Sequence, residues 1–169
     1  MSSKPLFNNI CVAVNGSQSS IHAAMYGILL AKTYHLNLKV VYVVDTATTK
    51  QLALSKFFVA DEREVYEANL SSDGDRYLTY VGNLAKSKGV IVDLELRKGA
   101  VWSELITAAD EFRADIILLG GKEADMSYTA GSSVRHSVLS ASRSEIIANA
   151  HCSVLVVHKP DIEQLFKIA

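Results

Sequence analysis

The apolar residues of the chain concentrate in short runs, separated by longer stretches with a helical repeat. Residues 114–120 and 152–158 are the clearest runs, because most positions are apolar and many side chains are β-branched. Such runs are too short for helices and are typical of strands buried on both faces of a parallel sheet. The pattern predicts strands at residues 10–14, 38–44, 91–96, 115–119 and 153–158.

The stretches between these runs repeat apolar residues every three or four positions, which indicates amphipathic helices. The first helix is expected to begin after a cap at Ser17 or Ser19 and to end near His35. Two further helices are predicted over residues 101–112 and 140–150.

A long helix is predicted over residues 62–88, followed by Gly89, which suits a helix C-terminus. Residues 71–74 inside it read Ser-Ser-Asp-Gly, which are poor helix formers. We therefore expect a kink or a split at this point of the helix. Residues 46–61, which precede the helix, give no clear pattern.

The alternation of strands and helices predicts an α/β fold, a three-layer α/β/α sandwich with a five-stranded parallel sheet. Right-handed crossovers place helices on both faces of such a sheet. A chain of 169 residues suits one domain with a sizeable core, so residues 1–169 are expected to form a single domain.

The composition narrows the classes of function. Apolar residues make up 49% and charged residues 21%, and the net charge is −1, so nothing calls for a nucleic-acid or membrane partner. No apolar run reaches transmembrane length and the first residues lack an export signal, so we expect a cytoplasmic protein. Cys11 and Cys152 have no CxxC or histidine partner and are expected to be free, reduced thiols.

Candidate chemistry lies where the fourth strand ends. Gly120 and Gly121 follow that strand, and the helix expected at 140–150 begins with small residues, including Ser140 and Ser142. A strand, a glycine turn and a helix start form the arrangement in which α/β proteins hold phosphates. The alternatives are an ordinary tight turn at the glycines and simple helix capping by the serines.

Five segments of the chain, in the right order, resemble the universal stress protein family. The closest match is residues 114–120, Ala-Asp-Ile-Ile-Leu-Leu-Gly, against the family's Ala-Asp-Leu-Ile-Val-Val-Gly. The other segments are residues 10–17, 41–45, 98–106 and 150–157. The resemblance implies a sheet of order 3-2-1-4-5, of the Rossmann-like, adenine nucleotide alpha hydrolase-like type. It also implies a nucleotide site between strands one and four, with adenine recognised by strand-two backbone near Val43.

The chain departs from the motif Gly-x2-Gly-x9-Gly-Ser/Thr of family members that bind ATP. Gly120 fits the first glycine, but Glu123 takes the second position and Ser140-Ala141 takes the final pair. A second register, from Gly121 to Gly131-Ser132, ranks lower because it leaves Leu118 as the first glycine. Asn15 stands where these members carry an aspartate that faces the nucleotide, so hydrogen bonding is kept and the charge is lost.

The resemblance and the departures from the ATP motif together imply a degenerate site for an adenine nucleotide or a small anion. Its expected residues are Val14, Asn15, Val43, Gly120, Gly121, Lys122, Ser140, Ala141 and Ser142. Lys122, Arg135, His136 and Arg143 could replace lost backbone contacts by pairing with phosphate, but the favoured interpretation is a solvated loop. No metal ligands at suitable spacing are found, and the cofactor is left open, with weak binding of AMP or ATP as candidates.

The leading hypothesis is a universal-stress-protein-like binding or signalling module in stress response, not an enzyme. The alternative is a dimeric interaction protein of the same fold that binds no nucleotide, and a small nucleotide hydrolase ranks third. Ser17 and His22 offer a nucleophile and a base, but Ser17 is better used as a helix cap. A homodimer is expected through the apolar strand Val154–Val157, which lies at the sheet edge in the order 3-2-1-4-5.

Overall fold

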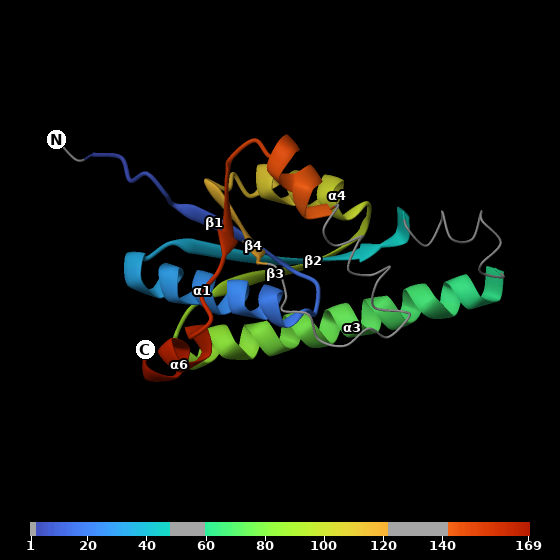
Figure 1. Ribbon diagram of the computed structural model, residues 1–169, viewed down its shortest axis with the longest axis horizontal. Helices are drawn as coiled ribbons and strands as arrows, with labels where there is room; N and C mark the ends of the chain where they lie inside the picture. Colours follow the sequence, from blue (N-terminus) through green and yellow to red (C-terminus); the bar gives the residue numbers. More distant parts are fainter. Residues whose placement is uncertain (1–2, 48–59, 122–141) are drawn as a thin grey trace.

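Five parallel strands form one sheet in the order β3-β2-β1-β4-β5 (Figure 1). This computed structural model describes residues 3–47, 60–121 and 142–169. The strands are β1 (Asn9–Val14), β2 (Asn37–Asp45), β3 (Val92–Gly99), β4 (Ile116–Gly120) and β5 (Ser153–Val157). The helices are α1 (Gln18–Tyr34), α3 (Ala60–Ser87), α4 (Val101–Glu111), residues 142–149, and α6 (Ile162–Ile168).

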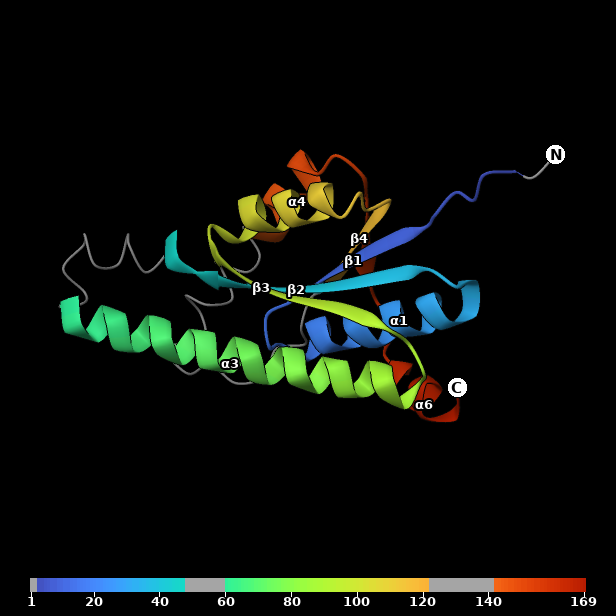
Figure 2. The same cartoon turned by 180° about the vertical axis from the view of Figure 1, so that it is seen from behind.

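Helices cover both faces of the sheet, so the predicted three-layer sandwich and its strand order are confirmed. Helices α1, α3 and α6 lie on one face, and α4 and the helix at 142–149 lie on the other (Figures 1 and 2). Each face has its own apolar cluster, and the alternation along β1 sends Val12 into one cluster and Cys11 into the other. Burial on both faces explains why the strands read as continuous apolar runs.

The two cysteines are free thiols, as expected. Cys11 on β1 is fully buried and Cys152 precedes β5, with β4 between the two strands. Burial raises the pKa of the Cys11 thiol to about 12, so this group stays protonated at neutral pH.

Helix α3 is continuous over its 28 residues, and the expected kink or split at residues 71–74 is wrong. Gly74 serves packing: a Cβ built on it would lie 2.5 Å from Leu96 Cδ1 and 2.7 Å from Tyr42 Cδ1. The glycine thus lets α3 approach β2 and β3 closely, and tertiary packing outweighs its low helix propensity. N-terminal to this contact, α3 extends past the carboxyl end of β2 (Figure 1).

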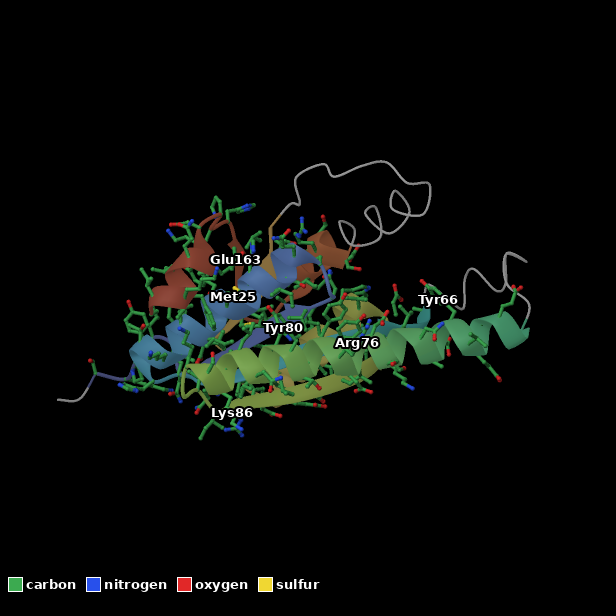
Figure 3. All side chains as sticks on the ribbon, turned by 90° about the horizontal axis from the view of Figure 1, so that it is seen from below. Met25, Tyr66, Arg76, Tyr80, Lys86 and Glu163 are labelled. Carbon is green, nitrogen blue, oxygen red and sulfur yellow. The ribbon has the colours of Figure 1, made fainter. Side chains whose placement is uncertain are left out.

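Helix α6 was not predicted, and it adds to the α1 face of the sheet. Its Ile162 and Phe166, one helical turn apart, are 1% and 6% exposed. Glu163 projects toward α1, where His22 Nε2 lies 3.0 Å from its Oε1 (Figure 3). This hydrogen bond from His22 lowers the pKa of the Glu163 carboxyl. A seven-residue amphipathic segment is too short to stand out by its periodicity alone.

The packing at Gly74 predicts that Gly74→Ala destabilises the protein although alanine is the better helix former. The new methyl group must displace the ring of Tyr42, which is 3% exposed and stacked on Tyr77. Overpacking of this kind costs about 1–3 kcal/mol, more than the gain of about 1 kcal/mol in helix propensity. We expect a lower free energy of unfolding in urea for Gly74→Ala.

Gly82→Ala in the same helix is the matched control. Its Cβ would approach only Leu94 Cδ1, at 2.9 Å, and Leu94 is 38% exposed and has room to move. This variant should be as stable as the parent or more stable. Equal stability gains in both variants would contradict the close packing of α3 at Gly74.

Candidate functional site

The turn between β1 and α1 is held by a network of short hydrogen bonds. Ser17, one of the two caps that the sequence offered, caps α1, and its side chain accepts from Ser20 N at 3.2 Å. The Asn15 side chain accepts from Ser17 N through Oδ1 at 2.9 Å, and Asn15 N donates to Ser20 Oγ at 3.2 Å. Asn15 thus forms an Asx turn that fixes its side chain at the carboxyl end of β1.

Helix α3 also contacts this turn, through the ring of Tyr77. Gly16 has a positive φ of 82°, and a Cβ built on it would overlap Cε2 of the Tyr77 ring. Tyr77 in turn stacks on Tyr42 of β2, with ring centroids 6.2 Å apart. Only glycine satisfies both the backbone conformation and the close contact at this position.

The two glycines after β4 are required by contacts within the protein. A Cβ on Gly120 would lie 2.7 Å from the carbonyl carbon of Ser19, in the first turn of α1. A Cβ on Gly121 would lie 2.6 Å from His158 Nδ1 and 2.7 Å from Val157 O. These glycines therefore let the end of β4 fit between α1 and the end of β5, independent of any ligand.

The strand registers set several of the expected site residues side by side. Val14 pairs with Tyr42, Val12 with Leu118, and Gly120 with Val157. Extending these registers places Val43, Asn15, Gly121 and His158 level with one another, at the carboxyl ends of β2, β1, β4 and β5. We call these four residues the carboxyl-end row. Parallel strands lie about 5 Å apart, so Val43 and Gly121 are separated by roughly 10 Å.

A cation reaches the row from the helix at 142–149. Arg143, near the start of that helix, donates from Nη2 to the carbonyl oxygen of Gly121 at 3.1 Å. The guanidinium is half-buried and offers further N–H groups in a fixed fork. The sequence had named Arg143 among four cations that could pair with phosphate, with a solvated loop as the favoured interpretation, and its spacing from Gly121 gave no sign of this contact.

The remaining expected residues divide into described and undescribed positions. Val14 is buried, and Asn15, Val43 and Gly120 are half-buried at the ends of their strands. Ser142 opens the helix at 142–149. Lys122, Ser140 and Ala141 lie outside the described residues, as do Glu123, Arg135 and His136.

Ser17 and His22, the candidate catalytic pair, each bond to other residues. Ser17 is engaged in capping α1, and the imidazole of His22 bonds to Glu163 of α6. His151 likewise pairs with Asp110, its Nδ1 lying 2.9 Å from Oδ2. In residues 3–47, 60–121 and 142–169, no group of three or more histidine, cysteine or acidic side chains could hold a metal ion. Within the same ranges, no helix is both long and apolar enough to span a lipid bilayer.

The fold defines a doubly wound parallel α/β protein whose topological switch point lies between β1 and β4, where the carboxyl-end row is found. The sequence profile of the universal stress protein family matches residues 6–158. A universal stress protein of Methanocaldococcus jannaschii is 30% identical over 159 residues, which cover 94% of this chain and 86% of the relative. The chain belongs to the universal stress protein family.

Solved structures of the family share the fold. A family member from Burkholderia pseudomallei aligns with a TM-score of 0.68 at 25% identity, covering 92% of this chain and 98% of the other. A family protein from Arabidopsis thaliana with AMP bound gives 0.62 at 13% identity, with 91% and 94% covered. A universal stress protein in complex with cAMP gives 0.57 at 19% identity, with 90% and 97% covered.

The contact between β4 and α1 predicts that Gly120→Ala destabilises the protein. The added methyl group meets main-chain atoms of Ser19, which cannot rotate away as a side chain does. We expect the free energy of unfolding to fall by about 1–3 kcal/mol in chemical denaturation.

Ser19→Ala provides the control, because it removes the Ser19 hydroxyl but leaves the carbonyl carbon and oxygen in contact with the new methyl group. The effect of Gly120→Ala should persist in this background. Full rescue by Ser19→Ala would show that the side chain, not the backbone of α1, limits the approach.

Proposed function

We propose that this protein is a binding module of stress response that holds an adenine nucleotide or a small anion weakly at the carboxyl-end row. The observation that carries the proposal is the alignment of Val43, Asn15 and Gly121 across the switch point, with Arg143 on the Gly121 carbonyl. The AMP and cAMP bound to two structural neighbours support a nucleotide as the ligand. The role would be exercised in the cytoplasm, by residues 1–169 acting as one domain.

A ligand with one phosphate suits this site better than ATP. Glu123 and Ser140 replace two glycines of the ATP motif, and each brings a Cβ where backbone would approach phosphate. Glu123 adds a negative charge that repels a polyphosphate. Arg143 supplies a fixed cation for a single phosphate group, and the backbone of β2 at Val43 is retained for a base.

Catalysis is the least supported role. Among the described residues the Ser17 hydroxyl bonds to Ser20 N and Ser19 Oγ, and the His22 imidazole bonds to Glu163. No hydrogen bond joins Ser17 to His22 there, so the contact that a nucleophile and its base need is missing. A hydrolase role would require phosphate release from ATP above background by the purified protein.

A second candidate function, dimerisation through β5, is supported by the sheet edge. β5 is the last strand of the sheet, and its Val154, Leu155 and Val156 are only half-buried. An apolar edge strand with unpaired backbone groups favours pairing with a second copy around a two-fold axis. We propose a homodimer that uses this edge.

Nucleotide binding is tested by calorimetric titration with AMP, ADP and ATP in the presence of magnesium. We expect AMP to bind at least as tightly as ATP, because the site offers one fixed cation and lacks two motif glycines. Mass spectrometry of ligands released from the denatured protein would identify a co-purified nucleotide. Micromolar or tighter ATP binding, with AMP weaker, would contradict the single-phosphate proposal.

The oligomeric state is tested by light scattering at high protein concentration. We expect twice the monomer mass of 18.4 kDa. Val156→Lys should give a monomer, because a charge placed at the half-buried edge opposes strand pairing. Val65→Lys, at an exposed position of α3, is the control and should remain dimeric. A monomeric parent protein would exclude the β5 dimer.

A further inference from the structure

Four segments of the chain meet at the end of the molecule where the strands begin. The chain before β1 and the C-terminal ends of α1, α3 and α6 all lie at this end (Figures 1 and 2). Helix α6 joins α1 through Lys32 Nζ, which donates to Ala169 O at 2.9 Å. It joins α3 through Lys88, whose Nζ lies 4.8 Å from the centroid of the Phe166 ring. We call this surface the basic end, and its segments are residues 4–7, 32–37, 86–91 and 165–169.

The basic end carries lysines without acidic side chains. Its four segments contain no aspartate or glutamate, and their lysines are Lys4, Lys32, Lys86, Lys88 and Lys167. Two acidic residues near the starts of β3 and β4 are engaged elsewhere. Asp93 pairs with Lys39 at 2.9 Å, and Asp115 accepts from the main-chain N–H of Asn9 at 2.9 Å. No acidic side chain of the four segments therefore offsets the positive charge of the basic end.

The other end of α3 has the opposite charge. The first half of this helix extends past the carboxyl end of β2 and carries the bases Arg63 and Arg76 (Figure 1). Its acidic residues are more numerous, namely Asp61, Glu62, Glu64, Glu67, Asp73 and Asp75. The net charge of −1, from which we expected no membrane partner, thus conceals a separation of charge along the length of the molecule.

Large apolar side chains project from the basic end. Ile91 is 94% exposed, Ile168 84%, Leu6 83% and Tyr34 65%. A side chain this exposed stands out into solvent and does not line a groove, whereas the centre of a protein interface needs close packing against a matching surface. A lipid bilayer is fluid and takes up projecting apolar side chains without a matching shape, and lysines beside them attract anionic headgroups.

We propose that the basic end is a docking surface for an anionic lipid bilayer, with its lysines on the headgroups and Ile91, Ile168 and Leu6 inserted between them. Both contributions are needed, because a single weak signal gives only marginal and reversible attachment to a membrane. In this orientation the acidic half of α3 points away from the bilayer. The carboxyl-end row, at the opposite edge of the sheet, stays open, so docking does not depend on what the row binds.

Co-sedimentation of the full chain with lipid vesicles tests the proposal. One set of vesicles is phosphatidylcholine alone, and the other contains about one third phosphatidylserine, which supplies the negative surface potential. We expect binding to the anionic vesicles only. Binding should weaken about fivefold or more when NaCl is raised from about 0.1 M to about 0.5 M, because salt screens the attraction between exposed charges.

Two variants separate the apolar contribution from the charge. Ile91→Ser removes a projecting apolar side chain, and Lys86→Gln combined with Lys167→Gln removes two exposed positive charges. Each variant should bind the anionic vesicles about fivefold or more weakly than the parent protein. The three side chains are exposed, so the thermal transition should stay where it is in the parent, which shows that the variants are folded.

Matched controls carry the same changes away from the basic end. Val65→Ser replaces an exposed apolar side chain in the first half of α3. Arg76→Gln combined with Lys98→Gln removes two exposed positive charges, in the middle of α3 and at the carboxyl end of β3. Both controls should bind the anionic vesicles within about twofold of the parent protein.

Several results would overturn the proposal. Failure of the parent protein to bind anionic vesicles, or equal binding to both kinds of vesicle, excludes docking on an anionic bilayer. Unchanged binding by Ile91→Ser excludes insertion of its side chain, and equal losses in the variants and the controls exclude the basic end as the surface. Retention of the protein on immobilised polyglutamate without binding to vesicles would assign the basic end to an acidic protein partner instead.

Discussion

The close packing of α1 against the central strands is the constraint on which the rest of the structure depends. Ala23 and Ala24 of α1 are fully buried, and a Cβ on Gly27 would lie 2.8 Å from Val12 Cγ2 of β1. Small residues let the helix axis approach the sheet closely, so that the helix covers β1 and also contacts β4. A larger side chain at Gly27 would lift α1 and separate it from the end of β4.

The geometry of the carboxyl-end row follows from this packing. Because α1 starts directly beneath the sheet, the chain must reverse within Asn15, Gly16 and Ser17, and the first turn of α1 meets Gly120. The same reversal produces the Asx turn that orients the Asn15 amide. Tyr77 of α3 packs over Gly16. Helix α3 therefore shapes the turn that holds Asn15, although it contributes no residue to the row itself.

The fold could be predicted from the sequence because it depends on local pattern. Apolar runs and helical periodicity marked the strands and the main helices, and the resemblance to a family supplied the strand order. Contacts between distant residues were out of reach. Gly74 was interpreted as a helix breaker, because its contacts with Tyr42 and Leu96 exist only in the folded structure and leave no mark on the local sequence. The short α6 has too few residues for a periodic signal, and only its packing on α1 reveals it.

The site residues stay a prediction, and only part of their arrangement follows from the sequence. Asn15 and Gly121 directly follow β1 and β4, and Val43 lies in the last residues of β2, so topology alone implies that the three lie at one edge of the sheet. The position of Arg143 depends on how the helix at 142–149 packs beside β4, and the amide orientation of Asn15 depends on a backbone donor two residues away. Neither has a signature in residue spacing.

A crystal structure of the protein soaked with AMP tests the central claim most directly, namely that the carboxyl-end row is the ligand site. We predict a phosphate between β1 and β4, beside Arg143 on the Gly121 carbonyl, and the base toward Val43. AMP bound at another surface, with the carboxyl-end row left empty, would contradict the account.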